Sequence, residues 1–236
     1  MAMTKIAVAG TNGLAQLIAH FISTITSHPF VILSRGQVPG LSSKGWQVLV
    51  VDYNNTADLK FKLAGVDTVI STVSGTAQLN LIDAAASAHV RRFVPSEFGG
   101  PPSLRPEGDR LDNHHREAIL KLLQLEPHGM SFTVFTCGVL YERFAPGGLS
   151  SSQIGVNKAI GREDCTFQVS QYTRTSLADA ITFARAVRDE GKEMQLCQIV
   201  ATAEGQYDFT DANLCQLLNY RPEKFRDYLA RVWAPA

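Results

Sequence analysis

Near its start the chain reads Lys5-Ile-Ala-Val-Ala-Gly10-Thr-Asn-Gly13-Leu14, an apolar run that leads directly into a glycine-bounded turn. Apolar residues then recur at helical spacing, so a strand, a turn and a helix follow one another without a gap. In this context glycine permits the tight turn and lets the backbone approach a pyrophosphate, which the helix N-terminus stabilises. The stretch therefore predicts a dinucleotide site, and a purely structural turn is the alternative.

The helix expected over Gly13–Thr26 has two features that bear on its packing. Its third fingerprint position holds Gln16, where glycine normally permits close packing of helix against strand. We therefore expect this helix to lie slightly further from the sheet. Its apolar spacing predicts one buried face, made of Leu14, Leu17, Ile18, Phe21, Ile22 and Ile25.

Apolar runs alternate with helical stretches through the first 150 residues. This alternation predicts an α/β fold, a Rossmann-type doubly wound parallel sheet whose ligand crevice lies beyond the carboxyl ends of its strands. Residues 1–150 are expected to form the nucleotide-binding domain, and residues 151–236 a small second subdomain packed on it. The expected strands are Lys5–Ala9, Phe30–Ser34, Gln47–Val51, Val66–Thr72, Arg91–Pro95, Ser131–Thr136 and one near Met194–Ala201. The other expected helices are Ala57–Leu63, Thr76–Ala88, Leu111–Leu125, Ser176–Asp189 and two short ones near the C-terminus.

The ends of the expected strands carry the candidate nucleotide contacts. An NAD site usually has an acidic residue after the second strand, but this chain has Arg35, whose guanidinium suits a 2′-phosphate. The alternative is a solvated arginine at a strand end. Asp52 and Tyr53 end the third strand and are candidates to flank the adenine, and Ser71-Thr-Val73 ends the fourth, where small hydroxyl residues can approach the phosphates or ribose.

The composition narrows the classes of partner. Lysine plus arginine equals aspartate plus glutamate at 22 each, so no net charge attracts nucleic acid or an anionic membrane. The sequence shows no secretory leader and no apolar stretch near the roughly 20 residues that span a bilayer. The four cysteines are widely spaced, with no C-x-x-C motif and no histidine pair near them, which argues against a metal site. We therefore expect a cytoplasmic protein with a small-molecule partner and no nucleic-acid, membrane or metal partner.

Residues 94–99 read Val94-Pro-Ser-Glu-Phe-Gly99. Together with Val66–Val73 and Phe135–Phe144, this motif resembles the NmrA-like and isoflavone reductase-like family of atypical short-chain dehydrogenases. The resemblance covers residues 4–145 and is nearest to fungal members, many of which act in secondary metabolism. It implies a Rossmann domain with a small substrate domain.

The resemblance also implies which residues bind the ligands. NADP(H) would be held by the glycine turn, by two cations near the 2′-phosphate, and by segments that border the ribose and nicotinamide. The implied cofactor contacts are Gly10, Thr11, Asn12, Gly13, Leu14, Ala15, Arg35, Lys44, Ser71, Thr72, Val73, Pro95, Ser96, Glu97 and Phe98. The candidate substrate contacts are Phe98, Cys137, Gly138, Tyr141 and Phe144. Glu97 is alternatively a structural carboxylate that caps backbone amides.

The catalytic position departs from the family pattern. Family reductases carry a lysine general acid/base on the helix after the motif, where this chain reads Leu111-Asp-Asn-His-His115. Alignment places His115 at the lysine position, and imidazole can transfer a proton near neutral pH. Adjacent helical residues diverge by about 100°, so at most one of His114 and His115 can point into the site. A solvated helix surface is the alternative for the pair.

These observations predict an NADPH-dependent reductase of a small, largely apolar metabolite, aromatic or polyketide-like. The missing lysine leaves a non-catalytic, NADP-sensing regulator of the NmrA-like type as an alternative. A further alternative is an isomerase, cyclase or dehydratase that uses the same fold without net redox chemistry. Because the C-terminal part is shorter than is usual in the family, the substrate pocket is expected to be shallower, more open, or completed by a second subunit of a homodimer.

Overall fold

Six parallel strands form one sheet in the computed structural model, which describes residues 4–138, 156–157, 168–169, 174–206, 215, 217–221 and 223–232. Their order is β3-β2-β1-β4-β5-β6, so the chain fills one side of β1 first and then the other. This order confirms the predicted Rossmann-type fold and puts the topological switch point between β1 and β4. The strands are β1 (Ile6–Ala9), β2 (Phe30–Ser34), β3 (Val48–Val50), β4 (Thr68–Ser71), β5 (Arg92–Val94) and β6 (Ser131–Phe132).

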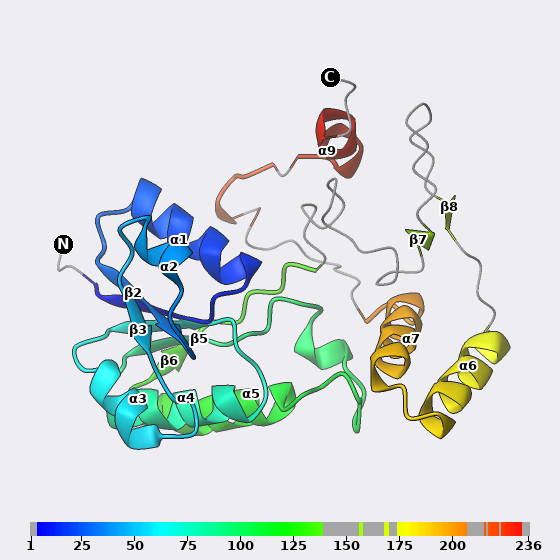
Figure 1. Cartoon of the computed structure of the whole chain (residues 1–236), viewed down its shortest axis with the longest axis horizontal. Helices are drawn as coiled ribbons and strands as arrows, with labels where there is room; N and C mark the ends of the chain where they lie inside the picture. Colours follow the sequence, from blue (N-terminus) through cyan, green and yellow to red (C-terminus); the bar gives the residue numbers. More distant parts are fainter. Residues whose placement is uncertain are drawn as a thin grey trace. The chain divides into compact units, whose positions relative to one another are not determined.

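Helices cover both faces of this sheet (Figure 1). Because side chains alternate along a strand, Ile6 and Val8 of β1 face one helical layer and Ala7 and Ala9 face the other. The second layer contributes to the larger core, in which Phe93 of β5 is fully buried. The first layer contains α1 (Gly13–Ile25) and α2 (Pro39–Ser42), and the second contains α3 (Thr56–Lys62), α4 (Thr76–Ser87) and α5 (His115–Leu125).

The buried face of α1 differs from the prediction. Ala15, Ala19 and Ile22 are the buried residues, and Ile18 packs beside them as a half-buried side chain. Three residues of the predicted face are exposed instead: Leu17, Phe21 and Ile25. The apolar arc of this helix is wider than the face it packs, and the two alanines are the side chains that allow the helix to approach β1 and β2.

Contacts divide the chain into two units, residues 1–98 with 112–135 and residues 99–111 with 136–236. In the second unit, α6 (Arg174–Ala186) packs on α7 (Glu190–Ala203), β7 (Val156–Asn157) pairs with β8 (Gln168–Val169), and α9 (Phe225–Val232) is a further helix. The predicted domain boundary near residue 150 stays a prediction. None of the helices in the described part of the chain has the length and apolarity of a membrane span.

The strand predicted near Met194–Ala201 is wrong, because these residues form most of α7. Glu193, Leu196 and Ala201 are buried, which is the spacing of a helix face. Glu193 can be buried on this face because two arginines pair with its carboxylate. Its Oε1 lies 3.1 Å from Nε of Arg110 and 2.6 Å from Nε of Arg185. The ion pairs also connect the 99–111 loop to the two helices within the second unit.

Candidate functional site

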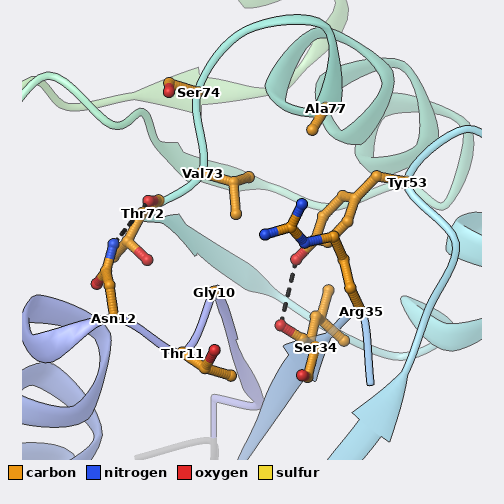
Figure 2. A pocket seen from close by; sticks show the side chains of 11 residues that line it. Gly10, Thr11, Asn12, Ser34, Arg35, Tyr53, Thr72, Val73, Ser74 and Ala77 are labelled. Carbon is orange, nitrogen blue, oxygen red and sulfur yellow. Dashed lines mark hydrogen bonds between the residues drawn. The ribbon is translucent and has the colours of Figure 1, made fainter. Parts of the chain in front are cut away.

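A cavity of about 480 Å³ lies where β1, β2 and β4 end, at the switch point of the sheet. Its volume is in the range of small-molecule and cofactor sites. Segments that follow four different strands contribute to its wall, together with one residue of α4 (Figure 2). The lining residues are Gly10, Thr11, Asn12, Leu33, Ser34, Arg35, Tyr53, Thr72, Val73, Ser74 and Ala77.

Gly10 turns the chain sharply out of β1. Its φ is +113°, a conformation that side chains oppose, and its amide donates to the carbonyl of Leu33 at 2.9 Å. A Cβ on Gly10 would overlap Oγ1 of Thr72. That hydroxyl is held in place because it donates to the carbonyl of Ala9 at 2.8 Å. Only glycine therefore fits between β1 and the end of β4.

Asn12 joins this turn to two other elements. Its Oδ1 accepts from the amide of Ala15 at 2.9 Å and so caps α1, while its Nδ2 donates to the carbonyl of Thr72 at 3.1 Å. The cap positions the first turn of α1 beside the cavity, and the amides of a helix N-terminus favour an anion. One side chain thus fixes both the helix and the neighbouring strand end.

Gln16 has a role that the sequence interpretation missed. Its Nε2 donates to the carbonyl of Thr11 at 3.0 Å, one turn back along the chain. The position that usually carries the third glycine therefore holds an amide that braces the turn from the helix side. Glutamine at that position was the available signal, but its hydrogen bond could not be predicted from spacing alone.

Arg35 lies on the opposite side of the cavity, directly after β2 (Figure 2). Its side chain is exposed, and no ion pair to its guanidinium is found among the described residues. Beside it, Tyr53 is buried and donates its hydroxyl to the carbonyl of Leu33 at 3.2 Å. Burial raises the pKa of Tyr53 and the nearby Arg35 charge partly opposes this, so the phenol remains a neutral donor.

The cavity brings together only some of the predicted cofactor contacts. Lys44 lies with its Nζ 4.9 Å from the ring centroid of Trp46, and Asp52 is exposed and accepts from the amide of Asn54. Four lining residues were not predicted as contacts: Leu33 and Ser34 lie within the predicted second strand, Ala77 lies within the predicted helix Thr76–Ala88, and Ser74 follows Val73. The predicted contacts in the wall are Gly10, Thr11, Asn12, Arg35, Tyr53, Thr72 and Val73, and those outside it are Gly13, Leu14, Ala15, Lys44, Asp52, Ser71, Pro95, Ser96, Glu97 and Phe98.

A second polar cluster joins the 95–98 segment to the start of α5. Nδ1 of His115 lies 2.6 Å from Oε1 of Glu97, whose side chain is completely buried. The buried Gln78 of α4 accepts from the amide of Ser96 at 2.7 Å and so fixes the neighbouring backbone. His114, by contrast, is half exposed and pairs with the exposed Glu117 at 2.8 Å. The two histidines therefore lie in different surroundings. His114 precedes α5 in the left-handed conformation, so the divergence expected of adjacent helical residues does not apply to the pair.

Asn113 connects this second cluster to the cavity. Its Nδ2 donates to Oγ of the lining residue Ser74 at 2.8 Å, and its carbonyl accepts from the amide of Gly75 at 3.2 Å. Asn113 and His114 have φ values of +41° and +63°, so two consecutive residues are left-handed. This turn delays α5 to His115, four residues after its predicted start at Leu111.

The predicted substrate contacts are only partly described. Cys137 is exposed and, like Gly138, belongs to the second unit, where the amide of Gly138 donates to the carbonyl of Gly99 at 3.2 Å. Tyr141 and Phe144 lie outside the described residues. Phe98 ends the first segment of the first unit.

The cavity fits a dinucleotide with a phosphorylated ribose. The space beside Gly10 would be filled by any Cβ, the capped N-terminus of α1 offers amides, and Arg35 supplies a positive charge. The first two features suit a pyrophosphate, and the Arg35 guanidinium suits a 2′-phosphate.

The family model described as NAD(P)H-binding matches residues 26–186, more than half of the chain. The match begins after the Gly10–Gly13 turn, so the contribution of the turn is argued from its geometry and position. Among curated relatives, the oxidoreductase BOA1 of Botryotinia fuckeliana is 36% identical over 108 residues, 41% of this chain and 36% of that protein. The isoflavone reductase homolog A622 of Nicotiana glauca is 28% identical over 61% of this chain and 51% of that protein. The chain thus spans about half the length of these relatives, or less.

Solved structures with this fold include two NADPH-linked enzymes. The NADPH-dependent quinone oxidoreductase QOR2 of Escherichia coli has a TM-score of 0.69 at 17% identity, covering 97% of this chain and 99% of that one. The leucoanthocyanidin reductase of Vitis vinifera has a TM-score of 0.68 at 17% identity, covering 98% and 100%. At these identities the likeness shows a common fold.

Proposed function

Since the chain belongs to the NAD(P)H-binding family, in its NmrA-like and isoflavone reductase-like group, we propose that it is an NADPH-dependent reductase of a small, largely apolar metabolite. One observation carries the proposal: the switch-point cavity has the glycine turn on one side and the Arg35 cation on the other. Several relatives in this group are named oxidoreductases, which supports redox chemistry in this chain.

The preference for NADPH over NADH rests on the end of β2. Ser34 is buried and its hydroxyl donates to the carbonyl of Gly36 at 2.7 Å, which closes the turn around Arg35. No acidic side chain lines the described cavity wall, so a ribose 2′-hydroxyl has no carboxylate partner there. A 2′-phosphate would instead meet a guanidinium, whose charge-assisted bonds are strong and directional.

When bound, NADPH supplies a hydride to the substrate. The residues of the chain bind and orient the two ligands, and His115 supplies a proton to the anion that develops on the substrate. From their place in the sequence, Phe98 of the Val94–Gly99 motif and Tyr141 and Phe144 of the Phe135–Phe144 segment are the residues that we expect to contact the substrate. Their aromatic side chains suit an aromatic or polyketide-like metabolite. Residues 151–236 serve as the substrate subdomain in this proposal.

The test follows NADPH absorbance in the presence of an aromatic enone, trans-chalcone, and a naphthoquinone, menadione. We expect NADPH consumption that matches the reduced product, with slower turnover when NADH replaces it. Tight NADPH binding without turnover of any acceptor would favour the NADP-sensing regulator. Product formation without cofactor consumption would identify an isomerase, cyclase or dehydratase. Activity that persists unchanged in His115→Ala would refute the proton-transfer role.

A further inference from the structure

Because the proposed function needs a proton donor, the buried pair near the cavity can be given a more specific role. We infer that Glu97 is a positioning residue that holds His115 in the one tautomer and orientation suited to giving a proton from Nε2. This inference rests on the proposed reductase function.

The geometry of the pair supports this role. The Glu97 side chain is completely buried and the His115 side chain is 17% exposed, and their Oε1 and Nδ1 atoms lie 2.6 Å apart. An ionised carboxylate can only accept a hydrogen bond, so Nδ1 carries the hydrogen in this contact. Nδ1 is therefore committed to Glu97, and Nε2 is the ring nitrogen left for exchange with another molecule.

The backbone around the pair is fixed on both sides. The hydrogen bond from Ser96 to Gln78 anchors the segment before Glu97, and the left-handed turn at Asn113 and His114 anchors the residue before His115. Strained backbone of this kind persists only where the surroundings enforce it, and it is concentrated at functional sites. The same turn contacts Ser74, a residue of the cavity wall. The pair is thus connected to the cofactor cavity through two hydrogen-bonded residues within one unit.

A neighbouring pair supplies the contrast. His114 and Glu117 form the same type of contact at 2.8 Å, but both side chains are about half exposed. Water competes for the hydrogen bonds of such an exposed pair, so the carboxylate holds the imidazole ring only weakly. A buried carboxylate has no water to replace its partner, and burying it is costly unless it is hydrogen-bonded. Of these two pairs, the one with Glu97 is therefore suited to fixing an imidazole tautomer.

This arrangement lets His115 give one proton and regain one in each turnover. In the imidazolium form of His115, the Nε2–H bond breaks and its proton passes to the anion on the reduced substrate. The ring is left neutral with its hydrogen on Nδ1, which is the tautomer that Glu97 accepts from. Solvent water then returns a proton to Nε2, so the ring needs neither rotation nor tautomer exchange between turnovers.

The first test observes the ring directly and does not depend on turnover. Long-range ¹H–¹⁵N correlation spectra of the full chain, assigned with His115→Asn, report which ring nitrogen carries the hydrogen. We expect wild-type His115 to show a protonated Nδ1, and Glu97→Gln to move that resonance toward an unprotonated nitrogen because an amide can donate to it. Glu97→Asp should retain the wild-type pattern. An unchanged His115 spectrum in Glu97→Gln would overturn the inference.

The second test measures turnover of NADPH with trans-chalcone or menadione. General acid catalysis contributes about 10²–10⁴-fold, so Glu97→Gln should lower kcat at least about tenfold while the KM for NADPH stays within about twofold. Glu97→Asp should recover part of the loss. Glu117→Gln, the matched change in the exposed pair, should leave kcat unaffected. A Glu97→Gln enzyme with wild-type kcat would contradict the inference.

The two tests separate the inference from the function on which it rests. If neither acceptor is reduced by the wild-type chain, the reductase proposal fails, while the spectra still decide whether Glu97 fixes the His115 tautomer. If turnover occurs and the spectra do not change, the reductase proposal stands and the role of Glu97 is refuted.

Discussion

The two sides of the switch-point cavity are built in opposite ways. On one side, the Gly10–Asn12 turn is braced by Thr72, by the Asn12 cap and by the Gln16 amide. On the other side, Arg35 is exposed, and among the described residues nothing forms an ion pair with it. The braced side is shaped during folding, whereas the charged side gains its partner only when an anion arrives.

This difference separates affinity from specificity. A preorganised turn loses little entropy on binding, so it favours any dinucleotide pyrophosphate equally. An unpaired guanidinium interacts strongly only with a ligand that carries the complementary charge, so it distinguishes the two cofactors. Substitutions in the turn should therefore affect stability and the binding of both cofactors, and substitutions of Arg35 should affect one cofactor.

The largest effect is expected for Gly10→Ala, which places a side chain where the braced turn is most tightly packed. The new Cβ would overlap the Thr72 hydroxyl at a φ that opposes a side chain, so we expect a loss of about 3 kcal/mol in unfolding free energy. Urea denaturation measures this loss. Gly13→Ala is the matched control for stability, because a Cβ there meets nothing within 4 Å. Equal losses in the two variants would show that the turn is not tightly packed.

Arg35→Ala tests the charged side. Charge-assisted hydrogen bonds contribute about 1.5–3 kcal/mol, so NADPH affinity should fall about 10- to 100-fold. NADH affinity, measured by the same fluorescence titration, should change by less than about twofold, and Arg35→Lys should give an intermediate NADPH affinity. The comparison breaks down if both cofactors lose affinity equally, because Arg35 would then act on a group that they share.

Asn12→Ala measures how much of the bracing comes from one side chain. Loss of a helix cap costs about 1 kcal/mol, and the additional bond to Thr72 brings the expected loss to about 2 kcal/mol. Asn55 caps α3 through the amide of Asp58, which makes Asn55→Ala the control for a cap alone. In urea denaturation, Asn12→Ala should lose about 1 kcal/mol more unfolding free energy than Asn55→Ala. Equal losses would show that the bond to Thr72 does not contribute to stability.

Gln16→Ala should have the smallest effect. Its half-buried bond to Thr11 is worth about 0.5 kcal/mol, and alanine regains part of that as the better helix former. Gln16→Glu should cost more than alanine in the same denaturation experiment, because its carboxylate would face the Thr11 carbonyl. It should also weaken NADPH and NADH binding alike, since a negative charge then adjoins the anion site. If the alanine variant is less stable than the glutamate variant, the amide does not donate as described.

The sheet could be predicted because each strand is a local pattern. The strand over Phe30–Ser34 was predicted with its observed bounds, since an apolar run between turn residues is sufficient to define it. The same reasoning failed at Met194–Ala201, where an apolar run belongs to a helix whose face includes the buried Glu193. Short apolar runs do not by themselves distinguish these two structures.

Only the parts of the site that lie within single segments of the sequence could be predicted. The glycine turn and Arg35 stand at strand ends, and parallel strands bring those ends together. The contact between Glu97 and His115 joins residues 18 apart across a chain excursion into the second unit, and no periodicity encodes it. Asn113 favours a left-handed turn by its residue type, but its contact with Ser74 depends on the fold, which brings the segment after β4 to the turn before α5.

The path of the chain between the two units has a consequence for synthesis. The chain leaves the first unit after residue 98, returns at 112, and departs again after 135. When residue 135 has left the ribosome, every strand of the large sheet is available, but Glu193, the carboxylate that pairs with Arg110, has not yet been made. The sheet can therefore assemble first and hold the 99–111 loop by both ends, which lowers the entropy that remains to be lost when the second unit folds.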